Sequence, residues 1–257
     1  MQHVEALAAP TLVVRAERAS QTSAFSLTRL LLLCGATAGP LFILTVLIQD
    51  YTRVDFDPRT HMLSLLALGD WGWVQVANFA GAGVLNVLYA VGLWRTLRTG
   101  RAGTAAAILI AAYGLGLVTV GIFTTDPAGG FPPGSVEPAG PSGHGIVHAL
   151  GALFVFLFLA AAIASLGRYF LSHGERGSGS YCIASAVVIM LLFFGGINNA
   201  EFMARLIRLA TFIGWLAPAL CAVKLLSSRT ELHRARTEQP GTQEVGIPAE
   251  LTTRALG

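Results

Sequence analysis

Charged side chains are scarce in this sequence. Of its 257 residues only 12% are charged, whereas 54% are hydrophobic. Ordinary soluble domains carry about 25% charged residues. Because so few charges cannot cover a water-facing surface, the composition excludes an ordinary soluble domain. The lipid bilayer is the solvent in which such an apolar chain is stable, and we therefore expect an integral membrane protein.

Cysteine is also rare, and several signature motifs are missing. The three cysteines, Cys34, Cys182 and Cys221, lie singly in separate apolar runs, which predicts packing residues and no disulfide framework. Neither a Walker loop nor the glycine pattern of a Rossmann fold occurs. No stripe of basic and aromatic residues is present to hold a phosphate backbone, so we expect no nucleic-acid partner despite the net charge of +3.

Six apolar runs are each long enough to cross a bilayer as a helix. About 20 apolar residues suffice, because the hydrocarbon core is about 30 Å thick and a helix rises about 1.5 Å per residue. The sequence thus predicts an all-α integral membrane protein, a bundle of six transmembrane helices. No charged residue lies in the middle of a run, which disfavours an ion-coupled transporter. The runs cover Leu30–Ile48, Trp73–Trp94, Thr104–Phe123, Ile146–Leu166, Tyr181–Asn198 and Leu206–Leu226.

Basic residues predict the orientation of these helices, because cytoplasmic loops are enriched in Lys and Arg. Of the 17 basic residues, 13 fall on one side of the predicted membrane domain, and only Arg53, Arg59, Arg205 and Arg208 fall on the other. We therefore expect both termini to be cytoplasmic. The predicted domains are a cytoplasmic tail at 1–29, the six-helix domain at 30–226 and a disordered cytoplasmic tail at 227–257.

Two long loops on the outer side carry turn-forming residues. In the first loop, Gln49–Trp71, Asp57 and Pro58 are typical of an N-cap followed by the first helical position, which predicts a short helix at the membrane interface. The second loop, Thr124–Gly143, is rich in proline and glycine. We expect it to be non-helical and to pack as a cap over the bundle.

A pair of histidines opens the fourth predicted helix. His144 and His148 are four residues apart, so their imidazoles share one helical face at a spacing that suits chelation of a metal ion. A zinc-bound water there would suit hydrolysis of a lipid headgroup or an amide, with Ser64 as a nucleophile or hydrogen-bond partner. The further candidate ligands on this side are His61, Asp57, Asp126 and Glu137.

The same residues also have a purely structural interpretation. Histidines at a helix start can bond to loop carbonyls, and no glutamate stands between His144 and His148 as it does in the metalloprotease helix. Asp57 and Asp126 are typical of helix and turn caps.

Small residues recur at a spacing of four within the predicted helices. Gly35 is followed by Gly39 in the first, and Ala77 by Gly81 in the second. In lipid, where van der Waals contact drives helix association, this spacing predicts close approach of helix backbones.

Several of these elements together resemble a known family. Over about Leu30 to Leu226 the sequence resembles the bacterial membrane family called domain of unknown function 998. The resemblance implies a multi-pass protein of the bacterial plasma membrane and carries no activity with it. The elements are Gly35 to Leu47, Asp57-Pro58 with His61 and Ser64-Leu65, Gly114-Leu-Gly-Leu, Gly121-Ile-Phe-Thr-Thr-Asp126-Pro127, and His144 with His148.

Three functions are compatible with these features. In the leading hypothesis an outward polar cap binds a lipid headgroup or a small ligand. In the second the protein is a zinc-dependent intramembrane hydrolase, with zinc held by His61, Asp126, His144 and His148. In the third it is a structural or partner-binding scaffold. The polar cap consists of Asp57, His61, Ser64, Asp126, His144 and His148.

Overall fold

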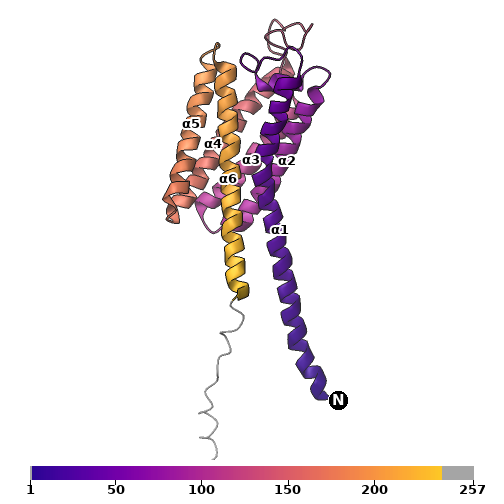
Figure 1. Cartoon of the computed structure of the whole chain (residues 1–257), viewed down its shortest axis with the longest axis vertical. Helices are drawn as coiled ribbons and strands as arrows, with labels where there is room; N and C mark the ends of the chain where they lie inside the picture. The colour runs from indigo at the N-terminus through magenta and orange to yellow at the C-terminus, as the bar shows by residue number, and fades with distance from the viewer. Residues whose placement is uncertain (1, 239–257) are drawn as a thin grey trace, which may run out of the picture.

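The computed structural model describes the backbone of residues 2–238 and the side chains of residues 25–231. Within this range the chain forms six α-helices and one short 3₁₀ helix, and no strand (Figure 1). The predicted all-α, six-helix architecture is therefore confirmed. The elements are α1 (Gln2–Thr52), η1 (Leu63–Ala67), α2 (Gly72–Leu97), α3 (Arg101–Ile122), α4 (Gly143–Ser172), α5 (Arg176–Ile197) and α6 (Met203–Glu238).

All six α-helices are long and apolar enough to cross a membrane, with mean hydropathy between 1.6 and 2.6 in their most apolar windows. Each predicted span falls on one of them. The first and last helices extend beyond the predicted six-helix domain of 30–226, because α1 begins at Gln2 and α6 continues to Glu238. The first part of the tail predicted as disordered, 227–238, is thus helical, and the rest, 239–257, lies outside the described residues.

The helices form a closed bundle in which each packs against its neighbours in sequence and α6 returns to pack against α1 (Figure 1). The connections 53–71, 123–142 and 198–202 gather at one end, which we call the loop end. At the opposite end, which we call the terminal end, α1 begins and α6 ends. An even number of helices brings the start of α1 and the end of α6 to the same end of the bundle.

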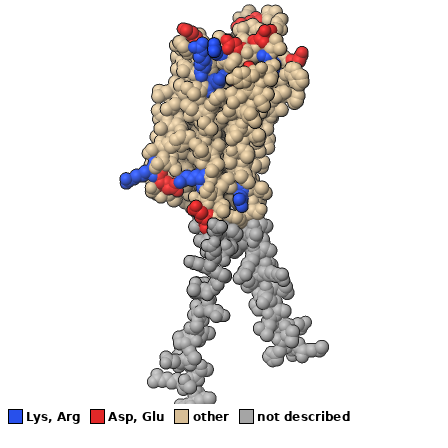
Figure 2. Space-filling model, viewed as in Figure 1, with Lys and Arg blue, Asp and Glu red and all other residues tan. Residues whose placement is uncertain are grey.

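Aromatic side chains fill the middle of the bundle. Phe42 of α1 stacks on Trp215 of α6 with ring centroids 4.6 Å apart, and Tyr113 of α3 meets the same indole edge-on at 5.5 Å. The buried Tyr89 hydroxyl of α2 donates to the Pro218 carbonyl at 3.3 Å. Outward-facing leucine, valine, isoleucine and phenylalanine side chains are exposed along the helices. The visible face is accordingly free of charge between its two ends (Figure 2), as a lipid-facing surface requires.

Glycine allows the closest helix contacts. A Cβ built on Gly35 would lie 2.4 Å from the ring of Tyr89, and one on Gly39 would lie 2.7 Å from the Trp215 carbonyl oxygen. The prediction of close packing at these two residues is confirmed. It is wrong for Gly81, around which nothing lies within 4 Å of the added Cβ, because that face of α2 points away from the bundle.

Candidate functional site

The first long loop begins with a turn, and its helix starts later than predicted. The Asp57 carboxylate accepts a hydrogen bond from the Arg59 amide at 2.9 Å, and the Asp57 carbonyl accepts one from the His61 amide at 2.8 Å. The chain then enters η1 at Leu63, a 3₁₀ helix whose leucines are buried. The helix predicted from Pro58 is therefore a turn followed by η1, because the His61 ring folds back onto the Asp57 amide and closes the turn.

His61 connects the two long loops. Its Nδ1 accepts from the Asp57 amide at 3.0 Å, which leaves Nε2 to donate to the Gly129 carbonyl at 3.0 Å. The ring is buried and packs against Phe56 and Phe131, whose ring centroids lie 5.3 and 5.6 Å from the centroid of the imidazole. Since both ring nitrogens already have partners in the protein, this histidine serves as a structural link in the observed conformation.

The second loop is non-helical, as predicted, and it packs against the first loop. A tight turn at Gly129 and Gly130, both with positive φ, lets Ala128 and Phe131 exchange two backbone hydrogen bonds. Phe131 is buried, and the Arg53 guanidinium lies 5.4 Å from its ring centroid. The same guanidinium donates to the carbonyls of Leu66 and Leu68, and its burial lowers the pKa of Arg53 while Asp70 opposes that shift.

Asp126 fixes the start of α4. Its carboxylate accepts from the Ser142 amide at 2.8 Å and from the Ser142 hydroxyl at 2.5 Å, and that hydroxyl in turn accepts from the Gly145 amide. These hydrogen bonds from Ser142 lower the pKa of Asp126. A Cβ on Gly145 would lie 2.0 Å from Asp126 Oδ2, so glycine is needed there for the carboxylate to reach the cap. The capping interpretation of Asp126 is confirmed.

The two histidines at the start of α4 face different surroundings. Nδ1 of the buried His148 contacts the carbonyl oxygens of Phe123 at 2.8 Å and Val120 at 3.2 Å, at the C-terminal end of α3. His144 is exposed, and its ring centroid lies 5.3 Å from that of Phe123. His148 therefore satisfies backbone carbonyls at the end of α3, as the structural interpretation expects.

The predicted metal ligands do not form a common ligand set. Among the described residues no group of three or more His, Cys, Asp or Glu side chains is placed to hold a metal ion. Glu137 accepts a long bond from the Gly129 amide at 3.4 Å, and Ser64 lies half-buried in η1. Four of the six residues of the polar cap, namely Asp57, His61, Asp126 and His148, instead hold turns, loops and helix ends together.

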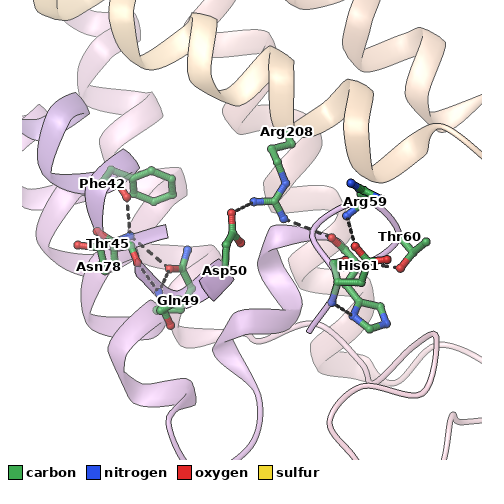
Figure 3. Close-up of polar contacts among 11 residues, drawn as sticks. Phe42, Thr45, Gln49, Asp50, Arg59, Thr60, His61, Asn78 and Arg208 are labelled. Atoms are coloured by element: carbon green, nitrogen blue, oxygen red, sulfur yellow. Dashed lines mark hydrogen bonds and ion pairs between the residues drawn. The ribbon is translucent and has the colours of Figure 1, made fainter. Parts of the chain in front are cut away.

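Beneath the cap lies an ion pair that the sequence alone did not indicate. Arg208 of α6 donates through Nη1 to Oδ2 of Asp50 in α1 at 2.6 Å, and the two side chains are only 12% and 5% exposed. A second nitrogen of Arg208 lies 3.4 Å from the His61 carbonyl, so the cap rests on this arginine (Figure 3). The pair joins the last helix to the first at the loop end.

Amide side chains adjoin this ion pair. Gln49, next to Asp50 in α1, donates to Oε1 of Gln75 in α2 at 2.8 Å, and both are buried. Asn78 donates to the same Gln75 oxygen and to the Phe42 carbonyl, each at 3.2 Å. We call Gln49, Asp50, Gln75 and Arg208 the polar cluster (Figure 3 labels three of them).

Each residue of the polar cluster keeps one buried polar atom without a hydrogen-bond partner in the described part of the chain. Two are acceptors, Gln49 Oε1 and Asp50 Oδ1, and two are donors, Gln75 Nε2 and Arg208 Nε. Buried polar groups are nearly always hydrogen-bonded, and an unpaired one costs about 1–3 kcal/mol. Four such atoms therefore remain without a partner at the loop end of an apolar bundle.

Sequence reasoning missed this cluster because its members are distant in the chain. Asp50 and Arg208 are 158 positions apart, and no local spacing pairs them. One signal was available, since Arg208 falls two residues inside the predicted span that starts at Leu206. A charged residue within a membrane span requires a partner and commonly marks a functional site.

One of three comparisons with known proteins found a match. A search of curated proteins and a search of solved structures each found no match. The family described as "Protein of unknown function (DUF998)" matches residues 36–224, which cover helices α2 to α5 entirely, most of the transmembrane part of α1, and α6 as far as residue 224. The chain is therefore a multi-pass membrane protein that belongs to the DUF998 family.

Proposed function

We propose that this protein binds a small polar ligand at the loop end of its bundle, through the polar cluster. The observation that carries the proposal is the set of four buried side-chain atoms without hydrogen-bond partners. They belong to three helices, α1, α2 and α6, so a bound ligand would also bridge elements that are far apart in sequence.

The chemistry of the cluster indicates which kind of ligand fits. The charges of Asp50 and Arg208 cancel, and their free atoms are one acceptor and one donor. A ligand of large net charge would be repelled by one member of the pair. A zwitterion matches both, because its anionic oxygens accept from Arg208 Nε and its ammonium donates to Asp50 Oδ1. Phosphoethanolamine, either free or as a lipid headgroup, has this composition.

The location of the cluster also supports binding of a ligand that comes from the interface between the membrane and water. Asp50 lies two positions before the end of α1, and Arg208 lies in the second turn of α6. A bilayer core of about 30 Å ends near such positions, where headgroups begin. The polar cap then covers the ligand from above, since the His61 carbonyl and the Phe56 ring both contact Arg208.

We further propose that the loop end faces outward, with both termini in the cytoplasm and the protein in the plasma membrane. The support is the 13 to 4 distribution of basic residues between the two ends. Ligand would then arrive from the outer leaflet or from outside the cell. A cysteine-accessibility reagent applied to intact cells would label an exposed position such as Tyr51→Cys if this orientation is right, and would leave it unlabelled if the bundle is inverted.

Native mass spectrometry can test the binding proposal. The full-length protein would be placed in nanodiscs of phosphatidylcholine with or without phosphatidylethanolamine, and free phosphoethanolamine would be added in a separate arm. We expect retention of the phosphatidylethanolamine or of the free compound, and at least a tenfold loss of retention in Asp50→Asn and Arg208→Gln. The lipid arm and the free-compound arm identify the source of the ligand.

A matched control comes from the other end of the bundle. Lys224→Gln removes the Lys224–Glu175 ion pair, which is half-exposed and far from the polar cluster, and should leave retention unchanged. The proposal would be refuted if wild type, Asp50→Asn and Arg208→Gln retained phosphatidylethanolamine or free phosphoethanolamine equally. The absence of any bound zwitterion in folded wild-type protein would refute it too, because water alone would then satisfy the cluster.

A further inference from the structure

A thiol pair joins α5 to α6 near the terminal end. Sγ of Cys182 in α5 lies 3.4 Å from Sγ of Cys221 in α6, although 39 positions separate them in sequence. Both side chains are buried, at 0% and 4% exposure. The third cysteine, Cys34, stands alone on α1, where its thiol donates to the Leu30 carbonyl. The chain thus holds one pair of adjacent thiols and one isolated thiol, a pairing that the sequence did not predict.

The thiol pair borders a cavity. A hollow of about 280 Å³ is lined by both cysteines together with Phe170, Tyr181, Leu220 and Lys224. Lys224 is half-exposed and forms an ion pair with Glu175, so the cavity approaches the polar edge of the bundle. Since a water molecule occupies about 30 Å³ in the liquid, the volume admits a small oxidant beside the sulfur atoms.

We propose that Cys182 and Cys221 form a redox-active dithiol that a hydroperoxide converts to a disulfide between α5 and α6. The thiolate of one cysteine attacks the terminal oxygen of the hydroperoxide, the O–O bond breaks, and an alcohol or water leaves. The resulting sulfenic acid is attacked by the second thiolate, the S–O bond breaks, and water leaves. Two thiols and one hydroperoxide therefore give one disulfide, one alcohol and one water. A dithiol reductant reverses the change.

The geometry suits the second of these steps. The sulfur atoms must approach from 3.4 Å to about 2.05 Å, a movement that a side-chain rotation and a small helix adjustment can supply. Because a partner thiol is already in contact, a sulfenic acid at either cysteine would be captured before further oxidation. Cys34 has no such neighbour among the other two cysteines, so it cannot form the intramolecular bond. This inference is independent of the proposed ligand site, which lies at the opposite end of the bundle.

Intact-mass measurement with thiol counting tests the proposal. The full-length protein in nanodiscs would be treated with hydrogen peroxide, unfolded, and alkylated with N-ethylmaleimide. Untreated protein should bind the reagent at all three cysteines. Treated protein should lose two hydrogens and bind it only at Cys34, and peptide mapping should find Cys182 joined to Cys221. Dithiothreitol should restore all three thiols, a readout that needs no variant.

The isolated cysteine supplies the matched control. Cys34→Ser should form the disulfide as readily as wild type, whereas Cys182→Ser and Cys221→Ser should not form it. Persistence of three free thiols after peroxide treatment of wild-type protein would overturn the proposal. Loss of the disulfide in Cys34→Ser, or a covalent dimer in place of the intramolecular bond, would overturn it equally.

Discussion

Arg208 in α6 contacts Asp50 in α1 with only 2.6 Å between Nη1 and Oδ2, and this ion pair closes the ring of helices at the loop end. It is the most buried ion pair among the described residues. The pair also lies under the polar cap, because the His61 carbonyl accepts from the same guanidinium. Arg208 thus contacts both the first helix, through Asp50, and the first long loop, through the His61 carbonyl.

Removing one partner of this ion pair should lower the free energy of unfolding more than replacing both partners with apolar residues. Asp50→Ala leaves the guanidinium buried and unpaired, and we expect the free energy of unfolding in detergent to fall by about 3–5 kcal/mol. The double variant Asp50→Leu with Arg208→Leu removes both charges and should recover most of that loss. Lys224→Ala, at the half-exposed pair of the terminal end, should cost about 1 kcal/mol or less. Equal losses for Asp50→Ala and Lys224→Ala would contradict the assigned burial.

Gly145 and Gly143 form a matched pair at the start of α4. Gly145→Ala places a Cβ 2.0 Å from Asp126 Oδ2 and should displace the carboxylate from Ser142, whereas Cβ at Gly143 meets nothing within 4 Å. Loss of a helix cap costs about 0.5–2 kcal/mol. Chemical unfolding in detergent should show that loss for Gly145→Ala alone. If both variants unfold alike, Asp126 is not held as described.

The pH dependence of stability should report on Asp126. Hydrogen bonds from Ser142 lower its folded-state pKa below the ordinary value of 3.8. The carboxylate therefore contributes stability that is fully present above that ordinary value and is lost as the pH falls through the lowered pKa. Thermal unfolding followed from pH 6 to below the ordinary value of 3.8 should show a decline at the acidic end that is smaller in Asp126→Asn. A decline of the same size in both proteins would assign it to other carboxyl groups.

His61 should limit local opening of the second loop. His61→Ala removes the bond to the Gly129 carbonyl, and we expect amide exchange at Phe131 to accelerate about tenfold, since one hydrogen bond contributes about 0.5–1.5 kcal/mol. His144→Ala is the control, because its ring is exposed and belongs to the same end of the bundle. Hydrogen exchange followed by mass spectrometry measures both. Faster exchange in His144→Ala as well would argue against a specific link through His61.

Helix packing can be tested at two glycines that each follow another small residue at a spacing of four in the sequence. Gly39→Ala brings a Cβ 2.7 Å from the Trp215 carbonyl of α6 and should destabilise the bundle by about 1–3 kcal/mol. Gly81→Ala meets open space and should be neutral or stabilise by up to about 1 kcal/mol, since alanine is the better helix former. Unfolding in detergent distinguishes the two. The packing assignment fails if Gly81→Ala is the more harmful.

Hydropathy and run length in the sequence were enough to predict the helical framework. Runs of about 20 apolar residues can satisfy their backbone hydrogen bonds in lipid only as helices, so length and hydropathy sufficed to locate all six. Local residue patterns were less informative, because Asp57 and Pro58 predicted a helix start and the structure has a turn there, with η1 beginning only at Leu63. The same local reasoning failed for Gly81, because a spacing of four marks a helix face without saying whether another helix covers it.

Tertiary structure alone decided which polar groups meet. His61 could have been a zinc ligand by residue type, yet the fold places it between Asp57 and Gly129, which is 68 positions away. Asp50 and Arg208 come together only because α6 closes the bundle against α1, and Cys182 and Cys221 only because α5 and α6 pack side by side. Helix order and rotation about each axis set these contacts. Both depend on the summed packing of the whole bundle, which no local pattern encodes.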